Sequence, residues 1–296
     1  MDKKNLLIMF KSKKFVYTAI IMFSAVMAFL FGKRLLKYYG ARPSKKDKRD
    51  FRIAGAGVQG GFPNEFSLPV PPIKDQGSVS SCVAHSVSYL SESILNPKHK
   101  TDRFAVGFVY GYRPSGYYKG EGMYPREAMK TIQQVGNVLH IDFPYNEEVP
   151  AITEKVFQEI DGLKRKAFNH RSVKYFQLKS NDEIKSCIMK YGPVSIMYPV
   201  HEEFMAPVNG KIDVKGLRRF QGYHQVSLYG WTGNYWQMVN SWGGNWCSNG
   251  TALISMSYPW TEAWGFSTDF NAEIAQKKTS FLSFLLGSSK DSEDNA

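Results

Sequence analysis

The spacing of apolar residues changes along this 296-residue chain, and the change falls at Pro193. Before Pro193, apolar side chains recur every three or four residues, which is typical of amphipathic helices. After it they recur at every second residue, which is typical of half-buried strands. Helices followed by strands favour an α+β fold in which the two kinds of element form separate lobes.

Local capping and turn residues set the expected boundaries of these elements. Ser80 or Ser81 can cap the first helix, Asp182 and Glu183 suit the first turn of the third, and a proline or glycine ends each helix. Gly233-Asn234 is a hairpin turn signal between two of the strands. The expected helices start at Ser80 or Ser81 and end at Pro97, run from about Arg126 to Val135, and start at Asn181 and stop at Gly192; the expected strands are Val194 to Val200, His224 to Trp231, Tyr235 to Val239 and Thr251 to Met256.

The N-terminal region contains eighteen consecutive uncharged residues, Phe15 to Gly32, preceded by five lysines. That length suits one crossing of a bilayer. Because the apolar run continues through Phe31, we expect an uncleaved single-pass membrane anchor. The alternative is a signal peptide whose removal releases a secreted protein. Basic residues flank the run on both sides, so the side of the membrane stays undetermined.

The positive charge of the chain is confined to its N-terminal part. The net charge is +12, yet residues 1–52 hold 14 Lys and Arg against three acidic residues, while residues 53–296 hold 24 against 23. A domain with balanced charge lacks the electrostatic footprint of a phosphate-binding surface, so we expect no nucleic-acid partner.

These patterns divide the chain into five expected segments. They are a basic N-terminal segment (1–14), the anchor or signal peptide (15–32), a basic and then Gly-rich linker (33–65), the folded domain (66–275) and a poorly ordered tail (276–296).

A cysteine at the start of the first helix is the strongest candidate for a nucleophile. The free backbone N–H groups and the dipole of a helix N-terminus favour the thiolate of Cys82 and lower its pKa. Gln76 lies six residues upstream in a Gly/Ser turn. Its side-chain amide and the backbone N–H of Cys82 are suitable donors to the oxyanion of a tetrahedral intermediate.

A nucleophilic cysteine also needs a base, and His224 opens a predicted strand. Asn240 follows sixteen residues later, so two neighbouring antiparallel strands would place its amide beside the imidazole. Such an amide fixes the histidine tautomer, and the other ring nitrogen then faces the sulfur. No metal-binding spacing of histidines or cysteines is present, and we expect neither a metal ion nor another cofactor.

Three motifs carry a family resemblance: QGSVSSC, YHQVSLYGW and NSWGGNW, in that order. Together they resemble the papain-like cysteine peptidases, and the likeness covers about residues 66–257. It implies a two-lobe fold, with a helical lobe, an antiparallel barrel-like lobe and a cleft between them. It further implies that Cys82 is the nucleophile, His224 the general base and acid, Asn240 the orienting group and Gln76 the oxyanion donor.

A weaker match extends the resemblance to the substrate. The stretch GEGMYPREAM resembles the glycine-rich substrate loop of the family. The resemblance places Gly122 and Met123 where the backbone of a polypeptide substrate would add as a short strand.

The chain also departs from the family pattern. Val79 stands where the family often has a cysteine bonded to the substrate loop, and Cys247 stands in place of a usual glycine. The basic lead before the domain is shorter than the inhibitory propeptides of plant and lysosomal members and resembles bacterial and viral members. Whether a propeptide-like or protein inhibitor acts on the domain stays open.

Other reactive or aromatic side chains have simpler structural interpretations. We expect Cys187 to be an inert core residue on the apolar face of its helix and His85 to serve packing alone. Trp242 and Trp246 are expected to pack over the His224 and Asn240 pair and exclude water.

The sequence therefore predicts a membrane-anchored endopeptidase that acts on polypeptides. One alternative is a catalytically weak protein that uses the same fold to bind peptides. Another is a Cys-His acyl transferase or peptidoglycan hydrolase with the same residue order, which the NSWGGNW block disfavours.

Overall fold

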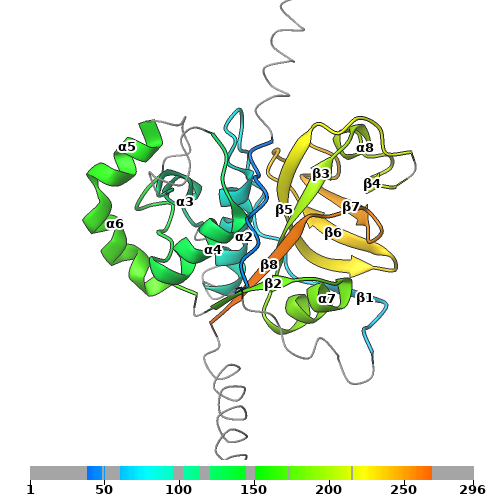
Figure 1. Ribbon diagram of the computed structural model, residues 1–296, viewed down its shortest axis with the longest axis horizontal. Coiled ribbons are helices and arrows are strands. Elements are labelled where there is room, and N and C mark those ends of the chain that lie inside the picture. The colour runs from blue at the N-terminus through cyan, green and yellow to red at the C-terminus, as the bar shows by residue number, and fades with distance from the viewer. Residues whose placement is uncertain are drawn as a thin grey trace, which may run out of the picture.

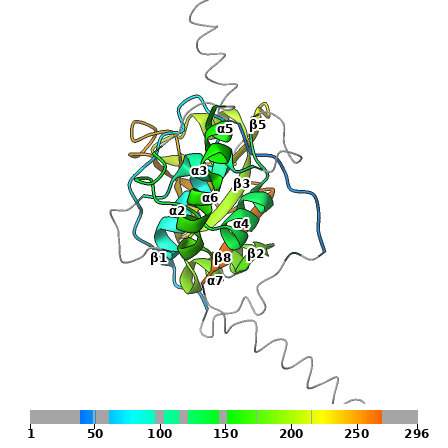
Figure 2. The same ribbon diagram turned by 90° about the vertical axis from the view of Figure 1, so that its left-hand side faces the viewer.

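The computed structural model describes residues 39–48, 50, 61–95, 103–113, 121–144, 151–172, 174–214 and 216–268. These residues form a helical lobe and a β lobe that lie side by side (Figure 1). In the second view the helices lie in front of the strands (Figure 2). The expected α+β fold with two segregated lobes is confirmed.

The helical lobe is built around one buried helix. This helix, α2, contacts β5 and β3 of the β lobe on one side and α3 and α4 on the other. Its first ten residues are all buried, including the polar His85, Ser86 and Ser88. The helices of this lobe are α2 (Cys82–Ile94), α3 (Val106–Gly111), α4 (Pro125–Gln134), α5 (Ala151–Gln158) and α6 (Ile160–Ala167), followed by the 3₁₀ turn η1 (Phe168–His170).

The β lobe is one curved sheet in the order β2-β8-β3-β5-β6-β7-β4, with β1 paired to β5. All neighbours are antiparallel except β4 and β7. The helix α7 (Asn181–Lys190) is capped by Ser180, whose side chain accepts a hydrogen bond from the Glu183 N–H. The strands are β1 (Glu65–Ser67), β2 (Lys174–Leu178), β3 (Val194–Val200), β4 (Lys211–Ile212), β5 (Gly222–Thr232), β6 (Tyr235–Val239), β7 (Thr251–Ser255) and β8 (Glu262–Ser267), and the short helix α8 (Glu202–Met205) follows β3.

The three predicted helices correspond to α2, α4 and α7, and the four predicted strands to β3, β5, β6 and β7. The strands β2 and β8 were not predicted. Every residue of β8 is buried, so it lacks the alternation by which half-buried strands are recognised. The strand β2 also precedes α7, and the order of helices first and strands afterwards is therefore not strict.

The two lobes meet across a small buried polar group. The hydroxyl of Ser86 on α2 lies 2.8 Å from that of Ser195 on β3 and 2.9 Å from that of Ser227 on β5. Buried hydroxyls that satisfy one another fix the register of the two lobes more specifically than apolar contacts do. The site described next lies at the N-terminal end of α2, beside this junction.

Two sequence expectations, the membrane span and the poorly ordered tail, concern residues outside the described ones. Within the described residues, no helix combines the length and apolar character needed to cross a bilayer. The proposed span Phe15–Gly32 and the tail 276–296 both lie outside them.

Candidate active site

Cys82 is the first residue of α2 and is completely buried. Burial raises the pKa of its thiol to about 11, although the backbone N–H groups of Gln225 and Gly40 donate to the sulfur and oppose this rise. The lowered pKa expected from the helix N-terminus is therefore wrong for the thiol as it stands in this structure. The physical reason is desolvation, because chain segments from both sides exclude water from the sulfur.

His224 and Asn240 are brought together at one end of a strand pair. Ser227 on β5 pairs with Val239 on the antiparallel strand β6. His224 precedes Ser227 and Asn240 follows Val239, so both lie beyond this pair at the same end of the two strands. His224 Nε2 lies 2.7 Å from Asn240 Oδ1, and both side chains are fully buried. Since an amide oxygen can only accept, Nε2 carries the proton and Nδ1 is the nitrogen able to take one.

Gln76 is held against the same segment as Asn240. Its backbone N–H donates to the Ser241 carbonyl over 2.8 Å, and its Oε1 accepts from the Ser241 hydroxyl over 2.6 Å. Its Nε2 donates to the Val79 carbonyl, three residues before Cys82. The Gln76 amide is therefore fixed between the start of α2 and the segment after β6.

Aromatic side chains cover the imidazole. The Trp242 ring stacks on His224 with a centroid distance of 4.6 Å, and Phe204 meets the imidazole edge-on at 6.0 Å. Trp246 packs against Trp242 at 5.4 Å. The expected packing over the imidazole is confirmed for Trp242, whereas Trp246 packs against Trp242.

Gly122 and Met123 lie on the helical lobe, and the backbone of Gly122 is held at both ends. Its N–H donates to the Tyr110 hydroxyl over 2.9 Å, and its carbonyl accepts from Arg113 Nη1 over 2.6 Å. Its φ of +93° is one that glycine adopts without strain. The next residue, Met123, consequently presents both its backbone N–H and its carbonyl to a neighbouring segment of the protein.

That segment consists of residues 39–48, before the first helix, and is here named the cover segment. It runs between the two lobes, drawn in blue in Figure 1. Met123 N–H donates to the Gly40 carbonyl over 2.8 Å, and Arg42 N–H donates to the Met123 carbonyl over 3.0 Å. On the other side, Ala41 N–H donates to the Tyr223 carbonyl on β5 over 3.3 Å. The cover segment therefore bridges the lobes directly above Cys82.

The cover segment is fastened at both of its ends. At one end, Tyr39 Oη donates to Gln221 Oε1 over 2.9 Å. At the other, the buried carboxylate of Glu262 accepts from the Ser44 N–H over 2.8 Å. Arg126 donates to the Lys45 carbonyl and pairs with the Asp50 carboxylate, 2.5 Å from its guanidinium. These residues had been expected to form a linker.

The remaining sequence expectations concern cysteines and histidines. No disulfide joins the three cysteines, and Cys187 is buried in the core of the β lobe, as expected. His85 is buried too, and burial lowers its pKa to about 3, so its ring stays neutral. Cys247 is exposed. Among the described residues, no cluster of His, Cys, Asp and Glu is arranged to hold a metal ion.

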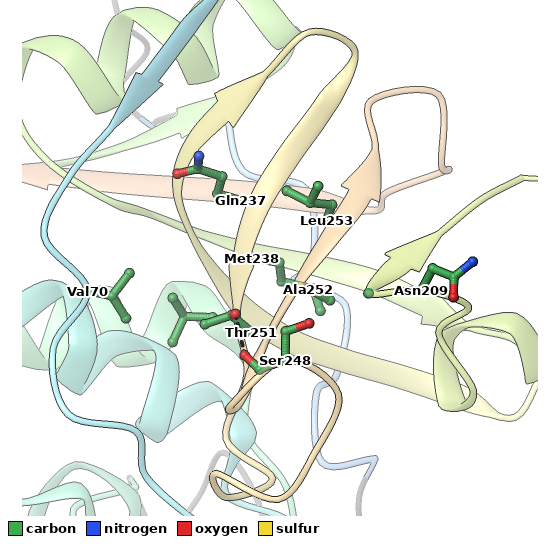
Figure 3. A pocket seen from close by; sticks show the side chains of 10 residues that line it. Val70, Asn209, Gln237, Met238, Ser248, Thr251, Ala252 and Leu253 are labelled. Carbon is green, nitrogen blue, oxygen red and sulfur yellow. Dashed lines mark hydrogen bonds between the residues drawn. The ribbon is translucent and has the colours of Figure 1, made fainter.

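A separate pocket of about 320 Å³ lies on the β lobe (Figure 3). It contains none of the residues that the sequence indicates for catalysis, and the side chains around it are all neutral. They come from β6, β7, the segment after β1 and the turns before β4 and β7: Val70, Asn209, Gly210, Gln237, Met238, Val239, Ser248, Thr251, Ala252 and Leu253.

Sequence patterns did not reveal two contributors to the site. Ser241 holds Gln76, and its place directly after Asn240 was the available signal. The cover segment gave no signal, because a basic stretch reads as solvated chain unless its partners are known.

Comparison with known proteins places this arrangement in a family. Residues 64–264 match the family described as papain family cysteine protease. Among curated proteins, the chain is 29% identical over 147 residues to cathepsin B-like cysteine proteinase 4 of Caenorhabditis elegans, covering 47% of this chain and 44% of that protein. It is 38% identical over 82 residues to cathepsin B-like cysteine proteinase 1 of Ostertagia ostertagi, covering 26% and 24%. The chain thus aligns with less than half the length of these relatives.

Solved structures share the fold at lower identity. Xylellain, a cysteine protease from Xylella fastidiosa, superposes with a TM-score of 0.68 at 19% identity, over 80% of this chain and 98% of that one. A procathepsin B from Trypanosoma congolense superposes with a TM-score of 0.62 at 16% identity, over 79% and 87%. With a family match over more than half of its length, the chain belongs to the papain family of cysteine proteases.

Proposed function

We propose that the protein is a papain-type endopeptidase in which Cys82 attacks the carbonyl carbon of a peptide bond. The observation that carries the proposal is the His224 Nε2 to Asn240 Oδ1 hydrogen bond of 2.7 Å, which directs the proton-accepting Nδ1 away from Asn240. Gln225, the next residue on β5, contacts the Cys82 sulfur through its backbone N–H. Nucleophile, base and orienting group therefore converge.

The reaction proceeds in two halves. His224 Nδ1 takes the thiol proton, the sulfur bonds to the carbonyl carbon, and the C–N bond breaks as the imidazolium gives its proton to the leaving amine. A water molecule then attacks the thioester while His224 takes a proton from that water. The C–S bond breaks, the acid is released, and the imidazolium returns its proton to the sulfur to restore the thiol. In both halves the negative oxygen is stabilised by the Cys82 backbone N–H and Gln76 Nε2.

The cover segment is proposed to hold this peptidase in a latent form. It occupies the Met123 backbone groups that would otherwise bind a substrate strand, and it keeps Cys82 out of solvent. A backbone N–H, that of Gly40, points at the sulfur, and the Gly40 carbonyl is bound by Met123 instead of facing Gln76. The segment therefore blocks the site without presenting a bond for attack.

Cleavage of an unfolded protein substrate tests the proposed activity. Cys82→Ala should abolish it, whereas Cys187→Ala, the matched change at a buried cysteine of the other lobe, should retain it in folded protein. Mass spectrometry of the chain with the cover segment displaced (Ala41→Trp, described below), after treatment with an epoxysuccinyl thiol-protease inhibitor, should find one adduct, on Cys82. If the chain with its cover segment displaced binds peptides but neither cleaves them nor forms the adduct, the result would instead support the peptide-binding alternative.

A bulky substitution in the cover segment tests latency. Ala41 is buried between the lobes, so Ala41→Trp should displace the segment and raise the rate of substrate cleavage by about tenfold or more, since even about 1.4 kcal/mol of lost contact gives that factor. Lys46→Trp adds the same ring at an exposed position of the same segment and should leave the rate unchanged. Equal rates in both variants would show that the cover does not inhibit.

We also propose that the enzyme is anchored in a membrane by residues 15–32. The support is the uncharged run with basic flanks, which meets the length needed for one crossing. Alkaline carbonate extraction should leave the full chain in the membrane fraction. Release of a species that begins near Phe29 would establish the signal-peptide alternative and a secreted enzyme.

A further inference from the structure

Three chain segments carry Cys82, Gln76 and Asn240 of the proposed catalytic site, and β5 carries the fourth residue, His224. The helix α2 carries Cys82, residues 74–76 carry Gln76, and residues 240–243 follow β6 and begin with Asn240. The last two segments run side by side, joined by the Gln76 N–H to Ser241 carbonyl bond of 2.8 Å and by the Gly243 N–H to Lys74 carbonyl bond of 3.1 Å.

One hydroxyl group joins the ends of this pair to the helix. Tyr89 lies on α2, about two turns after Cys82, and is 1% exposed. Its Oη accepts the Lys74 N–H over 2.6 Å and donates to the Asn240 carbonyl over 3.2 Å. A single oxygen atom thus contacts both segments, and its own helix carries the nucleophile.

We propose that Tyr89 is a positioning residue for the peptidase reaction, whose hydroxyl sets the placement of Gln76 and Asn240 relative to Cys82. The inference rests on the proposed function, since the positions matter only if those residues act together. Tyr89 touches neither substrate nor reacting atoms; it acts through the backbones of Lys74 and Asn240.

The surroundings of Tyr89 hold its ring in place. The Lys74 ammonium group lies 4.1 Å from the ring centroid and is fixed by an ion pair of 2.6 Å with Glu92. Tyr229 and Val239 pack with Tyr89 in one buried cluster. The Tyr229 hydroxyl donates to the backbone carbonyl of Tyr89 over 3.1 Å and does not bind its ring or hydroxyl. Because the ring cannot turn aside, its hydroxyl is a fixed point between the two segments.

The loss of that hydroxyl would leave two buried backbone groups without their partner. Unpaired buried groups move to find other partners, and a displacement of about 1 Å at a catalytic group can reduce turnover by about 10². The effect should appear in kcat, because Met123, which binds the substrate backbone in the proposed mechanism, lies on a separate loop.

The test uses the full chain with Ala41→Trp, so that the cover segment does not compete with the substrate, and adds Tyr89→Phe, which retains the ring and removes the hydroxyl. We expect kcat per active site, counted by titration with the epoxysuccinyl inhibitor that forms its adduct on Cys82, to fall by about 10- to 100-fold while KM changes by less than about threefold. The pH dependence of Cys82 alkylation should also shift, because the imidazole that pairs with the thiol loses its fixed partner.

Tyr229→Phe is the matched control, because it removes a buried hydroxyl from the same cluster, one whose hydrogen bonds go to the Ser93 hydroxyl and the Tyr89 carbonyl. It should match Tyr89→Phe in loss of thermal stability but keep kcat within about threefold of the parent chain. Equal kcat values in the two variants, or a loss confined to KM, would overturn the inference. Activity retained in Cys82→Ala would instead refute the proposed function itself.

A second variant keeps the inference testable if Tyr89→Phe does not fold. With 4-aminophenylalanine at position 89, the ring keeps an N–H donor to the Asn240 carbonyl but becomes a poor acceptor for the Lys74 N–H. Its kcat should lie between those of the parent chain and Tyr89→Phe. A kcat equal to the parent value would show that the bond to Lys74 is not needed and contradict the two-sided bridge.

Discussion

The side chain of Gln76 can be removed without removing its backbone contact to Ser241. Gln76→Ala should therefore leave the loop in place and delete one oxyanion donor, which lowers kcat by about 10² to 10³, or about 2.7–4 kcal/mol, with KM little changed. Steady-state kinetics measure the split. Gln237→Ala, in the separate pocket, is the control and should behave like the parent chain; a loss seen mainly in KM would contradict the assigned role.

His85 gives a prediction about acid stability. Burial lowers its pKa from 6.5 to about 3 in the folded chain, so between these pH values the unfolded chain binds a proton that the folded chain does not. The free energy of unfolding should therefore fall as pH falls from about 6.5 towards 3, by about 2 kcal/mol at pH 5 from this residue.

His85→Phe should remove that part of the acid sensitivity while changing kcat by less than about threefold at neutral pH. Thermal unfolding at pH 7 and pH 5 measures the difference. An unchanged pH dependence would show that His85 already takes a proton in the folded chain, and a large loss of kcat would show that it serves catalysis.

At this scale the sequence was informative for residues within short motifs. Cys82, His224, Asn240 and Gln76 were selected from local patterns, and the structure brings the four into one site. Tyr89 could not be found in this way, because its role depends on two backbone groups that lie 15 and 151 positions away in the chain. Its position on α2 predicted only a residue on a mostly buried helix.

Among elements, the loop that carries Met123 is held without a disulfide. Tyr110 and Arg113 bind the two backbone groups of Gly122, and the Ser80 hydroxyl donates to Glu121 over 2.7 Å. Where Val79 replaces the cysteine implied by the family resemblance, hydrogen bonds from α3 and from the residues just before α2 thus fix the substrate loop.

Tyr110→Phe should consequently raise KM by about fivefold, the effect of about 1 kcal/mol for one hydrogen bond, with kcat unchanged. Kinetics are measured in chains that also carry Ala41→Trp, so that the cover segment does not compete with the substrate. Tyr235→Phe, which removes an exposed hydroxyl of the β lobe, is the control and should leave KM unchanged. Identical KM values for both variants would refute this role of Tyr110.

Elements were predictable where their periodicity was regular. The strands β6 and β7, whose burial largely alternates, were found within a few residues, whereas the fully buried β8 was not. Residues 39–48 show a second limit of prediction from the sequence. Their charge suggested solvent exposure, but backbone hydrogen bonds to both lobes and the buried Arg126 and Asp50 pair decide their place.

For the whole molecule, the cover segment predicts an order of thiol reactivity. In the intact chain, iodoacetamide at neutral pH should modify the exposed Cys247 first, because burial raises the pKa of both Cys82 and Cys187. In Ala41→Trp, Cys82 should become the fastest of the three and stay reactive at pH 6, as is typical of thiolates paired with histidine. Peptide mass mapping gives the three rates, and a slow Cys82 in the uncovered chain would argue against its activation.

The fastening of Tyr39 beside Gln221 also limits how far the enzyme can reach. Together with the proposed anchor, the covered form has six residues between Gly32 and this attachment point, so the attachment point lies within about 25 Å of the bilayer. Once the cover segment leaves, the tether extends to β1 at Glu65, and the limit grows to about 115 Å. Activation would then enlarge the volume of solution searched by the active site as well as opening that site.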